Sequence, residues 1–300
     1  MNAYIKALRA PFLAGSVVPV LIGSAYAFFE GKFVLVPFLV AISGVGALHL
    51  AANLFNDYYD ARGSDLINIR LNPFSGGSRV IQDGEVKAEI IWVMGVFFLF
   101  IAWISAIWLT YKGRPLVFFM GFLGLLAGWI YSAPPLQLMS RGWGEVVIFL
   151  AFGPLITLGS NYVMSGDLSL KAFAMGFPQG FLITGVIWIN QFPDFEADSK
   201  AGKRNLVVRL GPSISRIPYC LIMLLSFASV IFLISLFDMP CLIMITLISL
   251  PLAFKAMIIA WREYLSNEGL IPAQALTIQT VMAQGLLLSF SLFLSRFIHV

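Results

Sequence analysis

Charged residues, cysteines and histidines are all scarce in this chain. Only 11% of its 300 residues are charged, and it has 2 cysteines and 2 histidines. Cys220 and Cys241 lie in different apolar stretches, so the sequence offers neither a disulfide framework nor a thiolate or multi-histidine metal site. No basic run is dense enough to indicate nucleic-acid binding. The net charge of +4 is therefore ascribed to membrane topology and to attraction for anionic lipid or substrate.

Apolar residues make up most of the remaining sequence. The chain is 59% hydrophobic with a mean hydropathy of +0.89, which is more apolar surface than one soluble core can bury. Nine stretches are nearly free of charge, and most reach the roughly 20 residues that a spanning helix requires. They predict an all-α, polytopic membrane protein with about nine transmembrane helices, at 12–29, 33–55, 90–111, 115–131, 146–164, 172–192, 217–237, 239–254 and 270–294.

No polar linker divides residues 1–300, so we expect a single transmembrane domain. The two longest hydrophilic connections, at about 56–89 and 193–216, both follow even-numbered spans and therefore share one side of the membrane. The first apolar stretch lacks a small-residue cleavage site and is expected to stay as a helix. With the N-terminus in the cytoplasm, the positive-inside rule places the C-terminus outside and both long loops inside. Few of the 19 basic residues are then outside: Lys32, Lys112, Arg114, Lys171 and Arg296.

Two acidic clusters stand at the ends of apolar stretches, and both contain the pattern N-x-F-x-D. Helical spacing puts the polar side chains of each cluster on one face: Asn53, Asn56, Asp57 and Asp60 in the first, and Asn190, Asp194 and Asp198 in the second. Clustered carboxylates at a membrane boundary are costly to desolvate and repel one another, so they require a compensating cation. Mg²⁺ fits best because it prefers oxygen ligands and is commonly held by carboxylates plus substrate phosphates. The alternative is that these acids are solvated helix ends facing the cytoplasm.

Basic residues follow both acidic clusters. Lys203 and Arg204 come soon after Asp198, and Arg79 follows a glycine pair at 76–77 in the first loop. A diphosphate needs both kinds of group, because a metal compensates its charge while lysine and arginine donate hydrogen bonds to its oxygens. The glycines would also let the backbone approach an anion closely. The alternative is that the basic residues only set the topology and that the glycines form an ordinary turn.

Longer motifs carry a resemblance to a known family. The sequence reads N-D-Y-Y-D at 56–60, Y-S-A-P-P-L at 131–136 and D-F-E-A-D-S-K-A-G-K-R-N-L at 194–206. In this order, and with nine spans, it resembles the UbiA-type intramembrane aromatic prenyltransferases over nearly the whole chain. Three further stretches are similar to the branch that prenylates 1,4-dihydroxy-2-naphthoate in menaquinone biosynthesis: G-K-R-N-L-V-V-R-L-G at 202–211, R-G-W-G-E at 141–145 and L-G-S-N-Y-V-M-S-G at 158–166.

The resemblance implies one bundle around a central, laterally open cavity in which two Mg²⁺ ions hold a prenyl diphosphate, with the two long loops as a cap. Catalysis would depend on Asp60, Asp194, Asp198 and Lys203, the last of which matches the diphosphate-binding lysine. The metal ligands matched by position are Asn56, Asp57, Asp60, Asp65, Asp194 and Asp198. Further contacts to the prenyl diphosphate are expected from Asn53, Arg79, Tyr131, Arg141 and Arg204. Many relatives carry a lysine just after the Y-S-x-x-P turn, so either Arg141 replaces it or that contact is missing.

The expected function is magnesium-dependent transfer of a prenyl chain from prenyl diphosphate to 1,4-dihydroxy-2-naphthoate or a related hydroxynaphthoate. The allylic cation of such a reaction needs an apolar chamber without water, and Tyr131 and Tyr58 are the first rings expected to stabilise it.

Two alternatives stay open: the same fold with 4-hydroxybenzoate or a glycerol-phosphate lipid as acceptor, and a cation-coupled transporter. The lipid bilayer is an expected partner, whereas no protein partner is inferable. His49 either lines the acceptor pocket or is a satisfied interior histidine.

Overall fold

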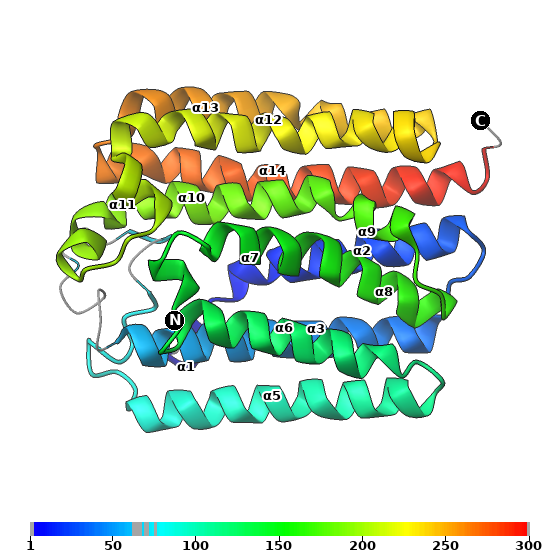
Figure 1. Cartoon of the computed structure of the whole chain (residues 1–300), viewed down its shortest axis with the longest axis horizontal. Helices are drawn as coiled ribbons and strands as arrows, with labels where there is room; N and C mark the ends of the chain where they lie inside the picture. The colour runs from blue at the N-terminus through cyan, green and yellow to red at the C-terminus, as the bar shows by residue number, and fades with distance from the viewer. Residues whose placement is uncertain (1–2, 62–67, 69–71, 75–76, 299–300) are drawn as a thin grey trace.

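The structure, a computed structural model, describes residues 3–61, 68, 72–74 and 77–298, and this part of the chain is predominantly helical. Long helices run side by side in one bundle (Figure 1). Within these described residues, eight stretches are long and apolar enough to cross a membrane, and α6 is a shorter apolar helix of 17 residues. In chain order the elements are α1 (Ala3–Leu8), η1 (Ala10–Leu13), α2 (Ala14–Phe29), α3 (Leu35–Asp60), α5 (Ala88–Tyr111), α6 (Leu116–Ser132), η2 (Leu138–Ser140), α7 (Gly144–Leu150), η3 (Ala151–Leu155), α8 (Ile156–Ser165), α9 (Leu170–Met175), α10 (Phe177–Lys200), α11 (Leu206–Leu210), α12 (Pro212–Phe237), η4 (Cys241–Ser249), α13 (Leu250–Glu263) and α14 (Asn267–Ser295).

The predicted all-α membrane class is confirmed, but several helices extend beyond the apolar stretches that predicted them. α3 continues to Asp60 and α10 continues to Lys200, so the prediction that loops begin at 56 and 193 is wrong. Hydropathy falls at those positions, whereas the backbone hydrogen bonds of a helix continue regardless of side-chain polarity. Likewise, η4 and α13 form one continuous stretch from Cys241 to Glu263, on which Lys255 is exposed.

The segment predicted as one span at 146–164 changes its helix type half-way, from α-helix to π-helix and back. α7 passes into η3, a five-residue π-helical segment that contains Pro154, and continues as α8. A proline cannot donate a backbone hydrogen bond, and π-bulges of this kind often occur at functional sites. Gly153 lets the backbone of η3 touch α9 and α10. A Cβ atom on Gly153 would lie 2.5 Å from the carbonyl oxygen of Gly176 and 2.6 Å from Cα of Gly180.

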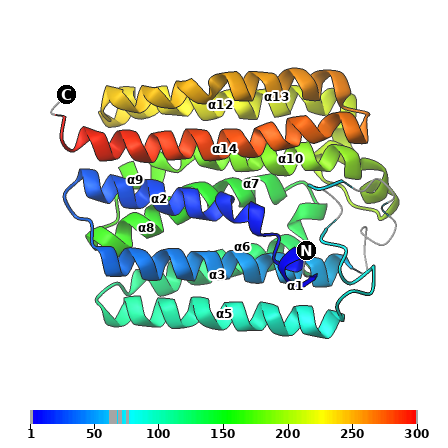
Figure 2. The ribbon, with the colours of Figure 1, turned by 180° about the vertical axis from the view of Figure 1, so that it is seen from behind.

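The bundle has two sides with further helices between them. α10, α12, α13 and α14 pack together on one side, α3, α5 and α6 lie on the other, and α2, α7 and α8 lie between (Figures 1 and 2). On the first side, the Tyr219 and Thr277 hydroxyls are hydrogen bonded at 2.7 Å, and Ser226 Oγ donates to Gln284 Oε1 at 2.9 Å. Such interhelical bonds hold helices together in an apolar bilayer. On the other side, α5 exposes Trp103 and further aromatic side chains that suit lipid contact.

The two ends of the bundle differ. α1 lies at the end that carries α11, whereas α14 finishes at the opposite end (Figures 1 and 2). The acidic motifs at the C-terminal ends of α3 and α10 both lie at the α1 end, as the sequence predicts. The side of the membrane that this end faces stays a prediction.

Candidate active site

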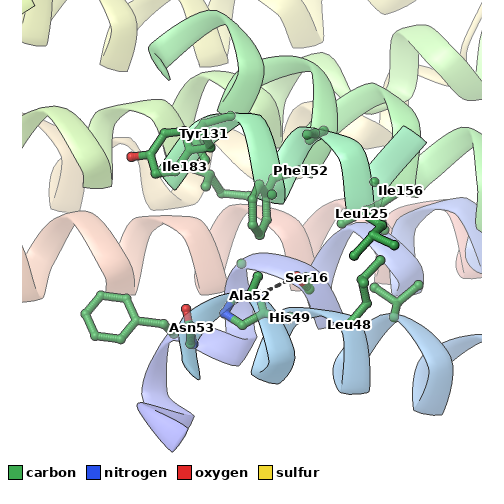
Figure 3. A pocket seen from close by; sticks show the side chains of 18 of the residues that line it. Ser16, Leu48, His49, Ala52, Asn53, Leu125, Tyr131, Phe152, Ile156 and Ile183 are labelled. Carbon is green, nitrogen blue, oxygen red and sulfur yellow. Dashed lines mark hydrogen bonds between the residues drawn. The ribbon is translucent and has the colours of Figure 1, made fainter. Parts of the chain in front are cut away.

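A cavity of about 430 Å³ lies inside the bundle and is lined by residues of both sides. Along α3 its wall extends from Val40 to Asp60, a rise of about 30 Å. The lining is polar near the C-terminal ends of α3 and α10: Asn53, Asn56, Asp60, Asn190, Gln191, Asp194, Asp198 and Lys203. Toward the opposite end it is apolar: Val40, Val45, Leu109, Val117, Leu155 and Val163. Figure 3 shows side chains of this wall from close by. The cavity can therefore accept a molecule with a charged head and a long apolar body.

The last two turns of α3 contribute one half of the polar end. Asn56 Nδ2 donates to Asp60 Oδ2 and to Ser132 Oγ, both at 3.0 Å. The first bond joins residues four apart on one helical face, and the second ties α3 to the end of α6. Asp60 is thereby held against the cavity with its side chain only 13% exposed.

The end of α10 contributes the other half. Asp194 Oδ1 accepts a hydrogen bond of 2.7 Å from Asn68 Nδ2, and Asp198 Oδ2 accepts one of 2.8 Å from Asn205 Nδ2. Asn205 also caps α11, because its side-chain oxygen accepts from the backbone N–H of Val208 at 2.8 Å. The helix dipole adds negative potential at the C-terminal ends of both α3 and α10, which increases the need for a cation between them.

Lys203 supplies a cation at this place. The backbone N–H of Lys203 donates to the Asp198 carbonyl at 2.9 Å and that of Gly202 to the Ser199 carbonyl at 3.1 Å, with Gly202 at φ +76°. This Schellman turn ends α10 and returns the chain toward its own last turn. Nζ of Lys203 consequently lies 3.2 Å from Asp198 Oδ1 and 4.0 Å from Asp60 Oδ1. One ammonium group thus connects the acidic ends of α3 and α10.

The oxygen-rich donor set suits Mg²⁺ shared with a phosphorylated ligand. Asn56, Asp60, Asp194 and Asp198 present amide and carboxylate oxygens to one cavity from two helices. Within the described part of the chain, no three His, Cys, Asp or Glu side chains converge closely enough to enclose an ion by themselves. Mg²⁺ prefers carboxylate and amide oxygens and commonly completes its shell with water and phosphate oxygens. Asp65, the remaining predicted ligand, lies outside the described residues.

The structure does not bring Asp57 to the other predicted ligands. Asp57 follows Asn56 directly, so its side chain projects about 100° further round the helix. It is buried away from the cavity lining, with Oδ1 accepting from the backbone N–H of Ser78 at 3.3 Å and lying 3.7 Å from Nη1 of Arg9. Asp57 therefore ties the segment after α1 and the segment at Ser78 to α3.

Three of the residues predicted to contact the diphosphate, Arg79, Arg141 and Arg204, are not among the cavity-lining residues. Arg79 pairs with Asp83 at 3.5 Å. Arg141 donates to the Pro135 carbonyl at 2.7 Å, and the carbonyl of Arg204 accepts from Arg209 at 2.7 Å. The side chains of Arg79 and Arg141 and the backbone carbonyl of Arg204 thus hold loop segments at this end of the bundle.

Asn53 and Tyr131 do line the cavity, as predicted. Asn53 Nδ2 donates to the Leu8 carbonyl at 3.4 Å, which links α1 to α3. Tyr58, in contrast, packs against the apolar cluster around Leu54 and Val86 instead of facing the cavity.

Sequence reasoning missed three residues that hold members of this site in place: Asn68 bonds Asp194, Asn205 bonds Asp198 and Ser132 bonds Asn56. Asn205 carries a recognisable signal, because an asparagine just before L-V-V-R-L at 206–210 is a typical N-cap. Ser132 lies within the Y-S-A-P-P-L stretch, but its bond to Asn56 joins residues 76 apart and leaves no local signal.

The comparison with known proteins agrees with this site. Residues 16–293 match the sequence profile of the UbiA prenyltransferase family. The chain belongs to this family. It is therefore a prenyltransferase embedded in a membrane, and the predicted resemblance is confirmed.

Individual relatives of this prenyltransferase differ in name. The 1,4-dihydroxy-2-naphthoate octaprenyltransferase of Escherichia coli K12 is 30% identical over 226 residues, which cover 74% of this chain and 73% of that protein. The UbiA prenyltransferase domain-containing protein 1 of Danio rerio is 28% identical over 264 residues, or 84% and 74% of the two chains. The solved structure of a UbiA homolog from Archaeoglobus fulgidus bound to GPP and Mg²⁺ has a TM-score of 0.64 at 16% identity, covering 96% and 99%. At that identity the likeness shows the fold.

Proposed function

We propose that this prenyltransferase transfers a prenyl chain from a prenyl diphosphate to 1,4-dihydroxy-2-naphthoate or a related hydroxynaphthoate, with the diphosphate at the α3–α10 end of the cavity. The observation that carries the proposal is the position of Lys203. Its ammonium group lies between Asp60 and Asp198 at the polar end of a cavity that is otherwise apolar. A diphosphate with a hydrocarbon tail matches that distribution of charge.

Asn56, Asp60, Asp194 and Asp198 would hold Mg²⁺, two ions in our proposal. When bound, Mg²⁺ supplies the positive charge that lets a site made of these four polar side chains bind the anionic diphosphate. Lys203 would donate hydrogen bonds to diphosphate oxygens, while Asn205 and Ser132 keep Asp198 and Asn56 in place.

The apolar part of the cavity would exclude water from the reacting carbon. In the proposed reaction the bond between prenyl C1 and the diphosphate oxygen breaks, and its electron pair leaves with the diphosphate. The ring carbon that carries the carboxyl group forms a new bond to C1. Loss of carbon dioxide from that carbon returns an electron pair to the ring, so no dedicated base is needed. Tyr131, whose ring lines the cavity near the acids, could stabilise positive charge on the prenyl group.

The naphthoate acceptor is supported by the names of the curated relatives, including the Escherichia coli enzyme. The name of the Danio rerio relative states no acceptor. The alternative is therefore that this enzyme, with the same fold, prenylates another acceptor. A transporter gains no support, because its site is expected near the bilayer midplane, whereas these acids lie at one end of the bundle. In line with the positive-inside rule, we propose that this end faces the cytoplasm.

The test is product formation by purified protein in detergent, where no ion gradient exists. The protein is incubated with Mg²⁺, an isotope-labelled prenyl diphosphate and, in parallel, 1,4-dihydroxy-2-naphthoate, 4-hydroxybenzoate or a glycerol-phosphate lipid. We expect a product from the naphthoate whose mass shows gain of the prenyl group and loss of carbon dioxide. Chelation should stop turnover, and added Mg²⁺ should restore it. Exclusive conversion of another acceptor would overturn the naphthoate assignment, and indifference to chelation would overturn the metal site.

A further inference from the structure

A buried histidine lies in the wall of the same cavity, away from the acids. His49 is on α3, and the helical rise places it about 10 Å from Asn56 along the helix axis. Its side chain lines the cavity, and the residue is only 8% exposed. Two other elements supply its neighbours, Ser16 of α2 and Phe152 of η3 (Figure 3).

Among the described residues, only one nitrogen of the His49 ring has a hydrogen-bond partner. Nδ1 lies 2.6 Å from Ser16 Oγ, whereas Nε2 is buried without a hydrogen-bond partner among the described residues. The ring meets that of Phe152 edge-on, with centroids 5.5 Å apart and an angle of 87° between the planes. These two contacts fix the orientation of the imidazole. A polar atom left unpaired in apolar surroundings is unfavourable, so Nε2 indicates a place for a polar group of a ligand.

We propose that His49, held by Ser16, binds a ring hydroxyl of the aromatic acceptor and thereby orients the ring toward the prenyl donor. The inference rests on the proposed function and deepens it. A prenyl chain has no polar atom to pair with Nε2, whereas a hydroxylated aromatic acceptor has one. A hydroxyl bound at His49 would place the ring between the imidazole and the diphosphate end, near Asn53 and Tyr131, which also line the cavity (Figure 3).

The Ser16–His49 pair allows Nε2 to act either as the donor or as the acceptor in the hydrogen bond to the ligand. The Ser16 hydroxyl can donate to Nδ1 or accept from it, so Nε2 can correspondingly donate to the ligand or accept from it. A phenolic hydroxyl can also play either part. The apolar edge of Phe152 and the neighbouring Leu48 and Ala52 would contact the ring itself.

The experiment measures initial rates in detergent for His49→Leu, His49→Gln and Ser16→Ala, varying acceptor and donor separately. Each rate is measured with 1,4-dihydroxy-2-naphthoate and with its methyl ethers, in which one hydroxyl can no longer donate. The matched control is Ser24→Ala, because Ser24 is also buried on α2 but does not line the cavity. Gel filtration and prenyl diphosphate binding check that each variant is folded.

We expect His49→Leu to raise KM for the acceptor about tenfold, or ~1.4 kcal/mol, and KM for the donor by less than about twofold. Ser16→Ala should have a smaller effect, and His49→Gln should recover part of the loss because its amide can still donate or accept. Discrimination against one methyl ether should disappear in His49→Leu. Unchanged acceptor KM, an equal rise in both KM values, or intact discrimination would overturn the inference.

If wild-type protein turns over none of the acceptors, the proposed function fails and direct binding decides the role of His49. Titration calorimetry then compares 1,4-dihydroxy-2-naphthoate binding to wild type and His49→Leu. Weaker binding to the variant supports the inference, and equal or absent binding overturns it.

Discussion

The ammonium group of Lys203 lies 3.2 Å from the carboxylate of Asp198, although Lys203 follows the end of α10. The contact exists because Gly202, at φ +76°, reverses the chain direction immediately after the helix. The same ammonium lies 4.0 Å from Asp60 of α3. A local turn thus produces the contact between two helices that are distant in sequence.

Lys203→Ala is expected to raise KM for prenyl diphosphate at least about tenfold. In the proposed complex Lys203 pairs with the diphosphate, and removing one partner of a buried charge pair leaves the charge of the other uncompensated. The KM of the acceptor should change much less, since Lys203 lies at the polar end. Steady-state kinetics with each substrate varied in turn measures both values. A loss confined to the acceptor would refute the role of Lys203.

Asp194→Asn should lower kcat/KM at least about a hundredfold, as expected when one charged group of an electrostatic site is removed. The substitution preserves shape and removes charge. Its control is Asp167→Asn, because Asp167 pairs with Lys32 at 3.3 Å in the connection between α8 and α9, at the opposite end of the bundle. Rates of purified variants with matched gel-filtration profiles provide the comparison. Near-normal activity of Asp194→Asn would remove this acid from the site.

Gly121→Phe should restrict the length of the prenyl chain. Gly121 lines the cavity, and a Cβ there would meet no atom within 4 Å, so the added ring can fill the space that a tail would use. The rate ratio of long to short donors should fall about tenfold or more. Gly46→Phe is the control, since Gly46 also faces open space but does not line the cavity. An equal loss of rate with donors of all lengths would contradict the proposal that the prenyl tail occupies the space beside Gly121.

Gly153→Ala should destabilise the protein by about 1–3 kcal/mol, the usual effect of overpacking a tight contact. The atoms that the new Cβ would meet belong to the backbone at Gly176 and Gly180, which cannot rotate away. Gly46→Ala should be neutral or stabilising, because alanine favours a helix by about 1 kcal/mol over glycine. Thermal unfolding in detergent compares the two variants. Equal melting temperatures would show that the contact at η3 is not tight.

The sequence alone predicts the helices and the acidic ends well, because hydropathy and helical spacing report local properties directly. Asp60, Asp194 and Asp198 meet at one cavity for this reason. The direction of the Asp57 side chain is harder to predict from the sequence. Its spacing puts it at the edge of the polar face, and contacts with Arg9 and Ser78, distant in sequence, decide its direction.

Residues in loops and long-range pairs could not be predicted in the same way. The direction of Arg141 depends on the turn around Pro135, whose carbonyl it contacts. The partner of His49 lies 33 residues earlier on another helix, so only the packing of α2 against α3 reveals the pair. Tertiary contacts, rather than local pattern, determine both positions.

The most direct test of the account measures whether Asp60 and Asp198 hold the same ligand. Titration calorimetry with a prenyl thiodiphosphate, with and without Mg²⁺, is applied to wild type, Asp60→Asn, Asp198→Asn and the double variant. We predict that each single substitution weakens Mg²⁺-dependent binding at least about tenfold and that the double variant loses less than the sum of both, as residues of one site do. Additive losses, or binding that does not depend on Mg²⁺, would contradict a shared site at the ends of α3 and α10.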